Sequence, residues 1–169
     1  MPDAKFFEGY GGQSTEDLLG LSPSYRTDSL VLAFEQALDQ KAARVGMAAL
    51  TPEERVVLAI EAFEREVNNG GYAQFFGNSS GEFVGDIAQS LETIGCPNYA
   101  EVTRRAIAAL EINGKPTPEQ IEAALDAGGE SLQAALEACD NAFFAVRSED
   151  VAERLFSFVR QRKEHVCVP

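Results

Sequence analysis

The spacing of apolar residues along the chain predicts helices. Val56, Ile60, Phe63 and Val67 recur at steps of three or four residues, which places them on one buried stripe of a helix. Alternating runs of β-branched residues, which are typical of strands, are absent from the sequence. We therefore predict an all-α fold, a compact multi-helix single domain.

Start and stop signals divide this pattern into separate helices. Thr51-Pro52-Glu53-Glu54 combines an N-cap threonine, a proline at the first helical position and a capping-box glutamate. Thr117-Pro118-Glu119-Gln120 repeats the arrangement, and Ser79-Ser80-Gly81-Glu82 predicts a further capping box. The predicted helices cover about 27–50, 51–67, 79–95, 97–113, 117–128, 131–144 and 148–163.

The first residues of the chain differ from the rest. They are rich in glycine, so we expect an irregular N-terminal arm over 1–22 followed by one helical domain over 23–169. No apolar run approaches the ~20 residues that span a bilayer, and the N-terminus lacks the features of a signal peptide. Three widely spaced cysteines favour neither a disulfide scaffold nor a zinc site. We therefore expect a cytoplasmic protein that binds no metal.

The negative charge is concentrated in the middle of the chain. Residues 45–153 contain 19 Asp and Glu against six Lys and Arg, a net charge of −13, while the two flanks together are neutral. Phosphates would be repelled by such a surface, so direct binding of nucleic acid is not expected. A basic protein surface is a plausible partner instead.

A cluster of turn-forming and aromatic residues follows the helix that begins near 52. Asn and Gly accept positive φ more readily than other residues, so this cluster predicts a fixed corner between helices. On this structural interpretation Val67 ends a helix, Asn68 and Asn69 turn the chain, and the aromatic residues that follow enter the core. Gln74 and Asn78 would then satisfy free backbone groups at the corner. The alternative is a pocket that binds a ligand through Asn68, Asn69 and Gln74. The cluster comprises Asn68, Asn69, Gly70, Gly71, Gln74, Phe75, Phe76 and Asn78.

These residues, with Glu66, resemble the signature of a bacterial domain family of largely unknown function. Further similarity lies at Ile94-Gly95, at 100–110 and at 136–144, so the resemblance covers roughly 28–163. The best-known member of that family is an acidic DNA-mimic protein that occupies the DNA-binding face of a transcription regulator. The resemblance implies a non-enzymatic partner of DNA-binding proteins.

Acidic residues at helical spacing are the candidate contact surface. On the helix after Thr117, successive acids are three, four and four residues apart and share one face, provided that Gly128 and Gly129 do not bend the axis too far. Four residues rise ~6 Å, which is comparable to the step between phosphates along a DNA strand. The first row is Glu119, Glu122, Asp126 and Glu130, and a second row on the helix after Thr51 is Glu53, Glu61 and Glu64.

One subunit has too few acidic residues to match the charge density of duplex DNA over its whole surface. Duplex DNA of about 40 Å, the expected diameter of this domain, carries roughly two dozen phosphate charges. Mimicry therefore requires that the acids gather on one side, and it favours a homodimer that joins two such faces.

Enzymatic chemistry has little support in the sequence. The single histidine, His165, lies near the C-terminus, and no phosphate-binding, dinucleotide-binding or zinc-protease motif occurs. We expect no catalytic residue and no cofactor. Two alternatives to DNA mimicry stay open: an immunity or antitoxin-type inhibitor of a basic toxin, and a small-molecule binder or enzyme that uses the corner at 68–71.

Overall fold

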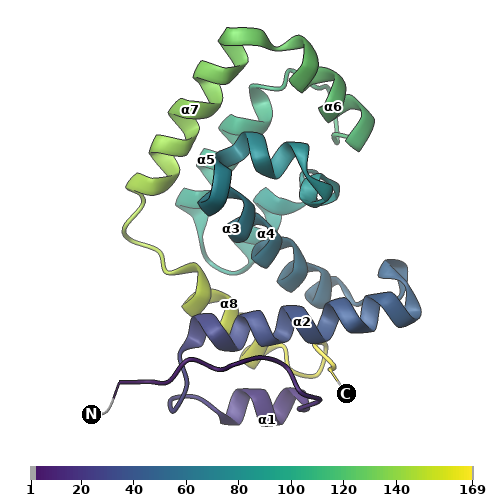
Figure 1. The fold of residues 1–169 in the computed structure, drawn as a ribbon, viewed down its shortest axis with the longest axis vertical. Helices are drawn as coiled ribbons and strands as arrows, with labels where there is room; N and C mark the ends of the chain where they lie inside the picture. Colours follow the sequence, from purple (N-terminus) through teal and green to yellow (C-terminus); the bar gives the residue numbers. More distant parts are fainter. Residues whose placement is uncertain (1–2, 169) are drawn as a thin grey trace. The chain divides into compact units, whose positions relative to one another are not determined.

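The computed structural model describes residues 3–168, which form two compact units. Of these residues, 3–61 and 151–168 belong to one unit, and 62–150 form the other. Between residues 3 and 168 the chain is helical and contains no strand, with a single β-bridge between Lys5 and Tyr25. The predicted all-α fold is confirmed (Figure 1).

Most of the helices begin and end near the predicted positions, but α3 ends about ten residues after the predicted position 67 and α4 begins about eight residues after the predicted position 79. Residues 3–168 form α1 Thr15–Gly20, α2 Thr27–Val45, α3 Pro52–Gly77, α4 Ile87–Thr93, α5 Pro97–Ala108, α6 Pro118–Ala127, α7 Gly129–Ala145 and α8 Val151–Gln161. Two short 3-10 helices, η1 Met47–Ala49 and η2 Ser79–Phe83, lie between them. The segment 1–22, expected to be an irregular arm, contains α1, which is capped by the Ser14 side chain.

In the first unit, α2 packs against α1 and α8. The start of α3 holds the C-terminal segment in place. Glu54 is fully buried, and its carboxylate accepts hydrogen bonds from Lys41 Nζ at 2.6 Å and from the Cys167 N–H at 2.9 Å. Thr51 forms the predicted capping box with Glu54 and donates its hydroxyl hydrogen to the His165 carbonyl at 2.6 Å. Glu54 thereby has a structural role in this unit.

In the second unit, α5 packs against α4 and α7, and α6 packs against α7 and η2. The core contains a cluster of aromatic rings around Phe63 and Phe143, whose centroids are 5.7 Å apart. The predicted capping box at Ser79 does not form. Asn78 precedes the 3-10 helix η2, the Ser80 hydroxyl donates to the Phe75 carbonyl, and α4 begins only at Ile87.

Candidate partner-binding surface

The corner in α3 lies at the two glycines and not at the asparagines. Gly70 and Gly71 have non-helical backbone angles, and Gly71 has φ 74°. Asn68 is still within the helix, where its amide donates to the Glu64 carbonyl at 2.7 Å. The prediction that Asn68 and Asn69 turn the chain is therefore wrong by two residues, because the glycines adopt the required angles without steric cost.

Glu66 joins the two parts of α3 across this corner. Its Oε2 atom accepts hydrogen bonds from the side-chain amides of Gln74, at 2.8 Å, and Asn78, at 2.7 Å. We expected Gln74 and Asn78 to satisfy free backbone groups, but both bind a carboxylate instead. Charge-assisted bonds of this kind are stronger than those between neutral groups, so they fix the direction in which the chain leaves the corner.

Tyr72 anchors the segment after the corner in the core. Its ring is fully buried, and its hydroxyl lies 2.9 Å from Thr103 Oγ1. The Tyr72 N–H donates to Asp140 Oδ1 at 2.8 Å, which satisfies a backbone group freed by the break in the helix. Phe75 and Phe76 are also buried, as predicted. Burial raises the pKa of Tyr72, although the bond to Thr103 acts in the opposite direction.

The first predicted acidic row lies on two helices. Glu119, Glu122 and Asp126 lie on α6, whereas Glu130 lies in the first turn of α7. Gly128 follows the end of α6 and Gly129 begins α7 with φ 54°, so the four acids do not share one continuous helical face. All four are exposed.

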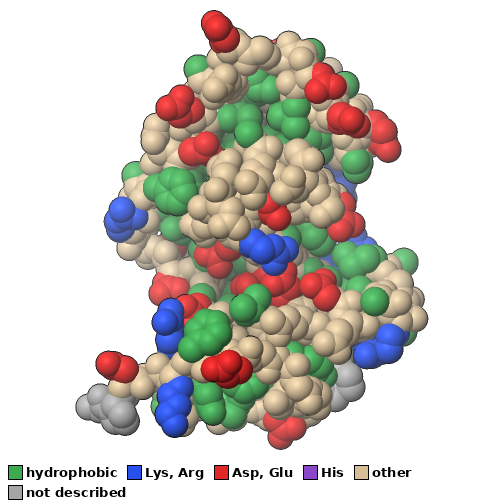
Figure 2. Space-filling model, in the orientation of Figure 1, with side chains coloured by type: hydrophobic (Ala, Val, Ile, Leu, Met, Phe, Trp, Pro, Cys, Tyr) green, Lys and Arg blue, Asp and Glu red, His purple; other side chains and the backbone are tan. Residues whose placement is uncertain are grey.

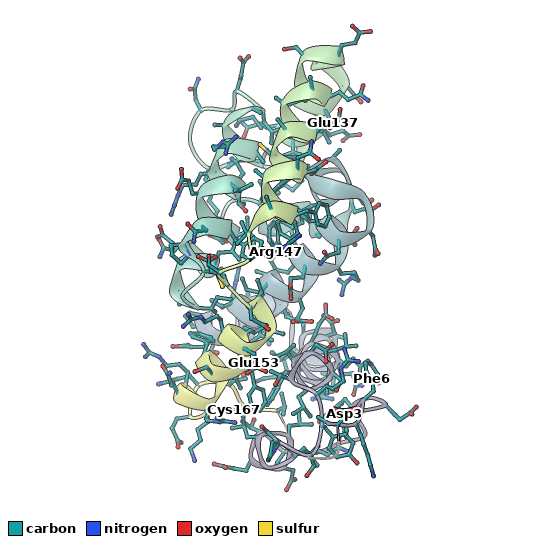
Figure 3. All side chains as sticks on the ribbon, turned by 90° about the vertical axis from the view of Figure 1, so that its left-hand side faces the viewer. Asp3, Phe6, Glu137, Arg147, Glu153 and Cys167 are labelled. Atoms are coloured by element: carbon teal, nitrogen blue, oxygen red, sulfur yellow. The ribbon has the colours of Figure 1, made fainter. Side chains whose placement is uncertain are left out.

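The stretch that carries this row contains no basic residue. Between Lys115 and Arg147 the sequence has six Asp and Glu and no Lys, Arg or His. Figure 3 shows Glu137 on α7 and Arg147 beyond the end of that helix. Within residues 3–168, no basic side chain forms an ion pair with the exposed acids of this stretch, so their charge is not compensated locally. These acids are Glu119, Glu122, Asp126, Glu130 and Glu137.

Two adjacent grooves lie beside these acids. The larger, of about 750 Å³, is formed by α6, α7 and Ala73 of α3, and the smaller, of about 520 Å³, is formed by α6, η2 and the end of α3. Leu125 and Asp126 line both. Figure 2 shows hydrophobic side chains between α6 and α7 with acidic side chains on either side. The acids of the two grooves are Glu82, Glu122, Asp126, Glu130, Glu137 and Asp140.

A family model described as DMP19-like protein matches residues 48–162, about two thirds of the chain. The chain belongs to the DMP19-like protein family. The resemblance inferred from the motif is thus confirmed, and the match begins some 20 residues later than the similarity estimated from the sequence. Neither a curated protein nor a solved structure matches the chain significantly.

The DMP19-like match covers the whole of the second unit, and this unit carries most of the charge. Residues 62–150 hold 15 Asp and Glu against five Lys and Arg, a net charge of −10 out of −13 for the chain. The base-free stretch, both grooves and the α3 corner all lie within it. The DMP19-like motif and the acidic surface are therefore parts of the same compact unit.

The second predicted row of acids does not form an exposed face. Glu61 is buried, with 8% of its surface exposed, and Glu53 and Glu64 are half-buried. Glu53 and Glu61 belong to the first unit and Glu64 to the second. The buried side of α3 is wider than predicted, since Val57, Leu58, Ala59 and Ala62 are buried as well as Ile60, Phe63 and Val67, whereas Val56 is only half-buried.

Three acids of the grooves are absent from the rows predicted from the sequence: Glu82, Glu137 and Asp140. The signal that could have found the last two is the absence of Lys and Arg from 116 to 146. The sequence predicts Glu82 as part of a capping box, whereas in the structure it is exposed and lines the smaller groove.

Other kinds of site find no support in the described part of the chain. Among residues 3–168, no group of three or more His, Cys, Asp or Glu side chains is placed to hold a metal ion. None of the helices formed by these residues combines the length and hydrophobicity needed to cross a membrane. Asn68, Asn69 and Gln74 do not line either of the two grooves, and Asn68 and Gln74 are engaged within α3.

Proposed function

We propose that this chain is a non-enzymatic DNA mimic that occupies the basic DNA-binding surface of a transcription regulator or another DNA-binding protein. The observation that carries the proposal is the base-free stretch of α6 and α7, whose exposed carboxylates have no ion-pair partner among residues 3–168. Membership of the DMP19-like family supports the same function.

The proposed mechanism is occlusion. Surfaces that bind DNA carry Lys and Arg side chains placed to neutralise phosphates. Glu122 and Asp126, four residues apart on α6, rise ~6 Å along its axis and offer carboxylates to such side chains in succession. Glu119 extends the contact at the start of α6, and Glu130 adds a carboxylate from the first turn of α7. A partner bound in this way has its phosphate contacts taken, so it cannot bind DNA simultaneously.

We further propose that two copies act together as a homodimer. The acids of one second unit are fewer than the phosphates of a duplex of similar length, and a two-fold axis would join two such faces into a longer track. Sedimentation of the purified protein should then give a mass about twice the 18.3 kDa of one chain. A monomer at micromolar concentration would refute this part of the proposal and leave occlusion by one copy intact.

The proposed activity requires no cofactor and takes place in the cytoplasm, where DNA-binding partners are available. The three cysteines form no disulfide in the structure, and the reducing cytoplasm keeps thiols in this state.

A displacement assay tests the function. Proteins captured by the native chain are identified, and the DNA-binding ones are bound to labelled DNA. The chain should release that DNA in proportion to its concentration. A variant with four substitutions should release the DNA only at a concentration at least about tenfold higher, because each exposed charge contact contributes up to about 1 kcal/mol. The substitutions are Glu119→Gln, Glu122→Gln, Asp126→Asn and Glu130→Gln.

A second variant controls for total charge. Glu8→Gln, Glu101→Gln, Glu111→Gln and Glu164→Gln also removes four exposed negative charges but leaves α6 and α7 unchanged. This variant should displace DNA about as well as the native chain. Equal loss in both variants would show that net charge alone matters. Capture of a nuclease or other toxin, with no effect on DNA binding by regulators, would instead establish the immunity-type function.

A further inference from the structure

The two grooves beside α6 have an apolar floor and an acidic rim. Leu132 and Leu136 are buried in the floor of the larger groove, and the half-exposed Leu125 is shared with the smaller one. Each groove is as large as the pockets that enclose whole ligands, of about 300–1,000 Å³, so it has room for several side chains. A surface that only repelled phosphates or attracted cations would need no such floor.

The polar residues along the rim of the larger groove are spaced like residues on one face of an α-helix. On α7, Glu130, Gln133, Glu137 and Asp140 all line the larger groove and follow one another at steps of three, four and three residues. Their span of ten residues is ~15 Å along the helix axis. A helix laid along this groove presents its own side chains at the same intervals, since its rows at i, i+3, i+4 and i+7 have the same rise.

An extended peptide does not fit this rim equally well. Side chains on one face of a strand recur every ~6.6 Å, whereas the rim residues on α7 recur every ~5 Å on average. The mismatch accumulates along the groove, so a strand places fewer cationic side chains opposite carboxylates. The spacing therefore favours a helical partner.

We propose that these grooves bind one amphipathic basic helix of the partner protein. The inference rests on the proposed function, because it assumes a basic partner, and it specifies which element of that partner is held. Apolar residues on one face of the helix contact Leu125, Leu132 and Leu136. Lys and Arg on its flanks extend their aliphatic stems over the same floor and bring their charged ends to the acidic rim.

Two synthetic peptides of identical composition test the proposal. One places Leu on a single helical face flanked by Lys and Arg, and the other has the same residues in an order that spreads Leu around the helix. Both carry the same charge. The amphipathic peptide should bind the full chain at least tenfold more tightly. When the amphipathic peptide is added, the amide chemical shifts of the full chain should change mainly in α6, in α7 and near Ala73.

Matched tryptophan variants test the location. Ala73 and Gln133 are exposed and line the larger groove, so Ala73→Trp and Gln133→Trp should each weaken binding of the amphipathic peptide at least tenfold. Ala134 is exposed on α7 but lines neither groove, so Ala134→Trp should leave the affinity unchanged. Circular dichroism checks that each variant is folded, and two blocking positions are used in case one substitution disturbs the fold.

The outcomes separate this inference from the proposed function. Equal affinity for the two peptides, with no effect of the blocking variants, would overturn the helix-in-groove inference even if DNA displacement were observed. Failure of DNA displacement, with selective binding of the amphipathic peptide in the groove, would overturn DNA mimicry and leave the groove as a helix-binding site.

Discussion

At the scale of single residues, the segment after the α3 corner depends on a short chain of buried hydroxyl groups. Thr103 donates its hydroxyl hydrogen to the Tyr99 carbonyl at 2.7 Å, so the Tyr72 hydroxyl is the donor in its 2.9 Å contact with Thr103. Both Tyr72 and Thr103 are fully buried. The hydroxyl of Tyr72 therefore has a fixed partner in a place that water does not reach.

Tyr72→Phe should remove this bond and little else. The Thr103 oxygen would lose a donor while its own hydrogen stays bound to Tyr99, so we expect a loss of about 0.5–1.5 kcal/mol in the free energy of unfolding. For a chain of this length that corresponds to a fall of about 1–6 °C in Tm, which calorimetry measures. Tyr25→Phe, at a half-exposed tyrosine, is the control. An unchanged Tm in Tyr72→Phe would contradict the proposed donor role.

Asp140 should make the stability depend on pH. Burial raises the pKa of its carboxyl above the ordinary 3.8, the bond from the Tyr72 N–H lowers it in part, and the charge of Glu137 raises it further. The folded state therefore holds the Asp140 proton more tightly than the unfolded state does. As pH rises from 3.8 through the raised folded pKa, ionisation costs stability, and above that pKa the cost is complete.

Asp140→Asn should be free of this cost. The amide oxygen can still accept the Tyr72 N–H, so the variant should gain stability relative to the native chain as pH rises through that window. Above the folded pKa the difference should become constant. Urea unfolding of both proteins from about pH 3.5 to 7 measures this difference. A difference that does not vary with pH would show that the Asp140 pKa is the same in the folded and unfolded states.

At the scale of elements, the direction of α3 changes at Gly71. The residue has φ 74°, and a Cβ placed there would lie 2.3 Å from Asp140 Oδ2. Gly71→Ala should therefore cost about 1–3 kcal/mol, because a φ of 74° with a ψ of −171° is a conformation that essentially only glycine adopts, with a further loss from the contact with Asp140. Gly77→Ala is a matched control, since its Cβ would lie 3.8 Å from Leu125 at ordinary contact distance. The Tm of Gly71→Ala should be well below that of Gly77→Ala. Equal Tm values would show that Gly71 is not required at the corner.

Helix boundaries were predictable where the signal was local. The capping boxes at Thr51 and Thr117 involve residues three positions apart, and both form. The same kind of signal at Ser14 and Asp17 could have revealed α1. At Ser79 the local signal fails, because the Ser80 hydroxyl bonds to the Phe75 carbonyl and the chain continues as a 3-10 helix. A hydrogen bond from Ser80 to α3 is present there in place of the predicted capping box.

The candidate site was predictable only where it depends on spacing within one helix. Spacing placed Glu119, Glu122 and Asp126 correctly on one exposed helix. The same spacing predicted an exposed Glu61, which is buried in the structure. The grooves depend on how α6, α7 and the end of α3 pack together. That packing is a property of several segments at once, so no pattern within one helix shows it.

At the scale of the whole molecule, charge is distributed unevenly between the two units. The second unit has a net charge of −10 and the first, by difference, −3. The uneven distribution of charge along the chain could be predicted from the sequence, because a count of charged residues requires no knowledge of packing. Long-range attraction of a basic partner should therefore originate mainly in residues 62–150, and within them in the base-free stretch from 116 to 146.

This distribution predicts how binding should respond to salt. Exposed charges attract over distances comparable to the Debye length, which falls as ionic strength rises, so the affinity for a basic DNA-binding partner should drop about tenfold or more between roughly 50 and 200 mM salt. Most of the loss should appear in the association rate, because rim charges act mainly by steering the encounter. The variant with amides at 119, 122, 126 and 130 should show a shallower dependence, whereas the control at 8, 101, 111 and 164 should keep most of the native slope. Surface plasmon resonance at four salt concentrations measures both rates. An affinity independent of salt in the native chain would exclude the carboxylates of α6 and α7 as the source of binding.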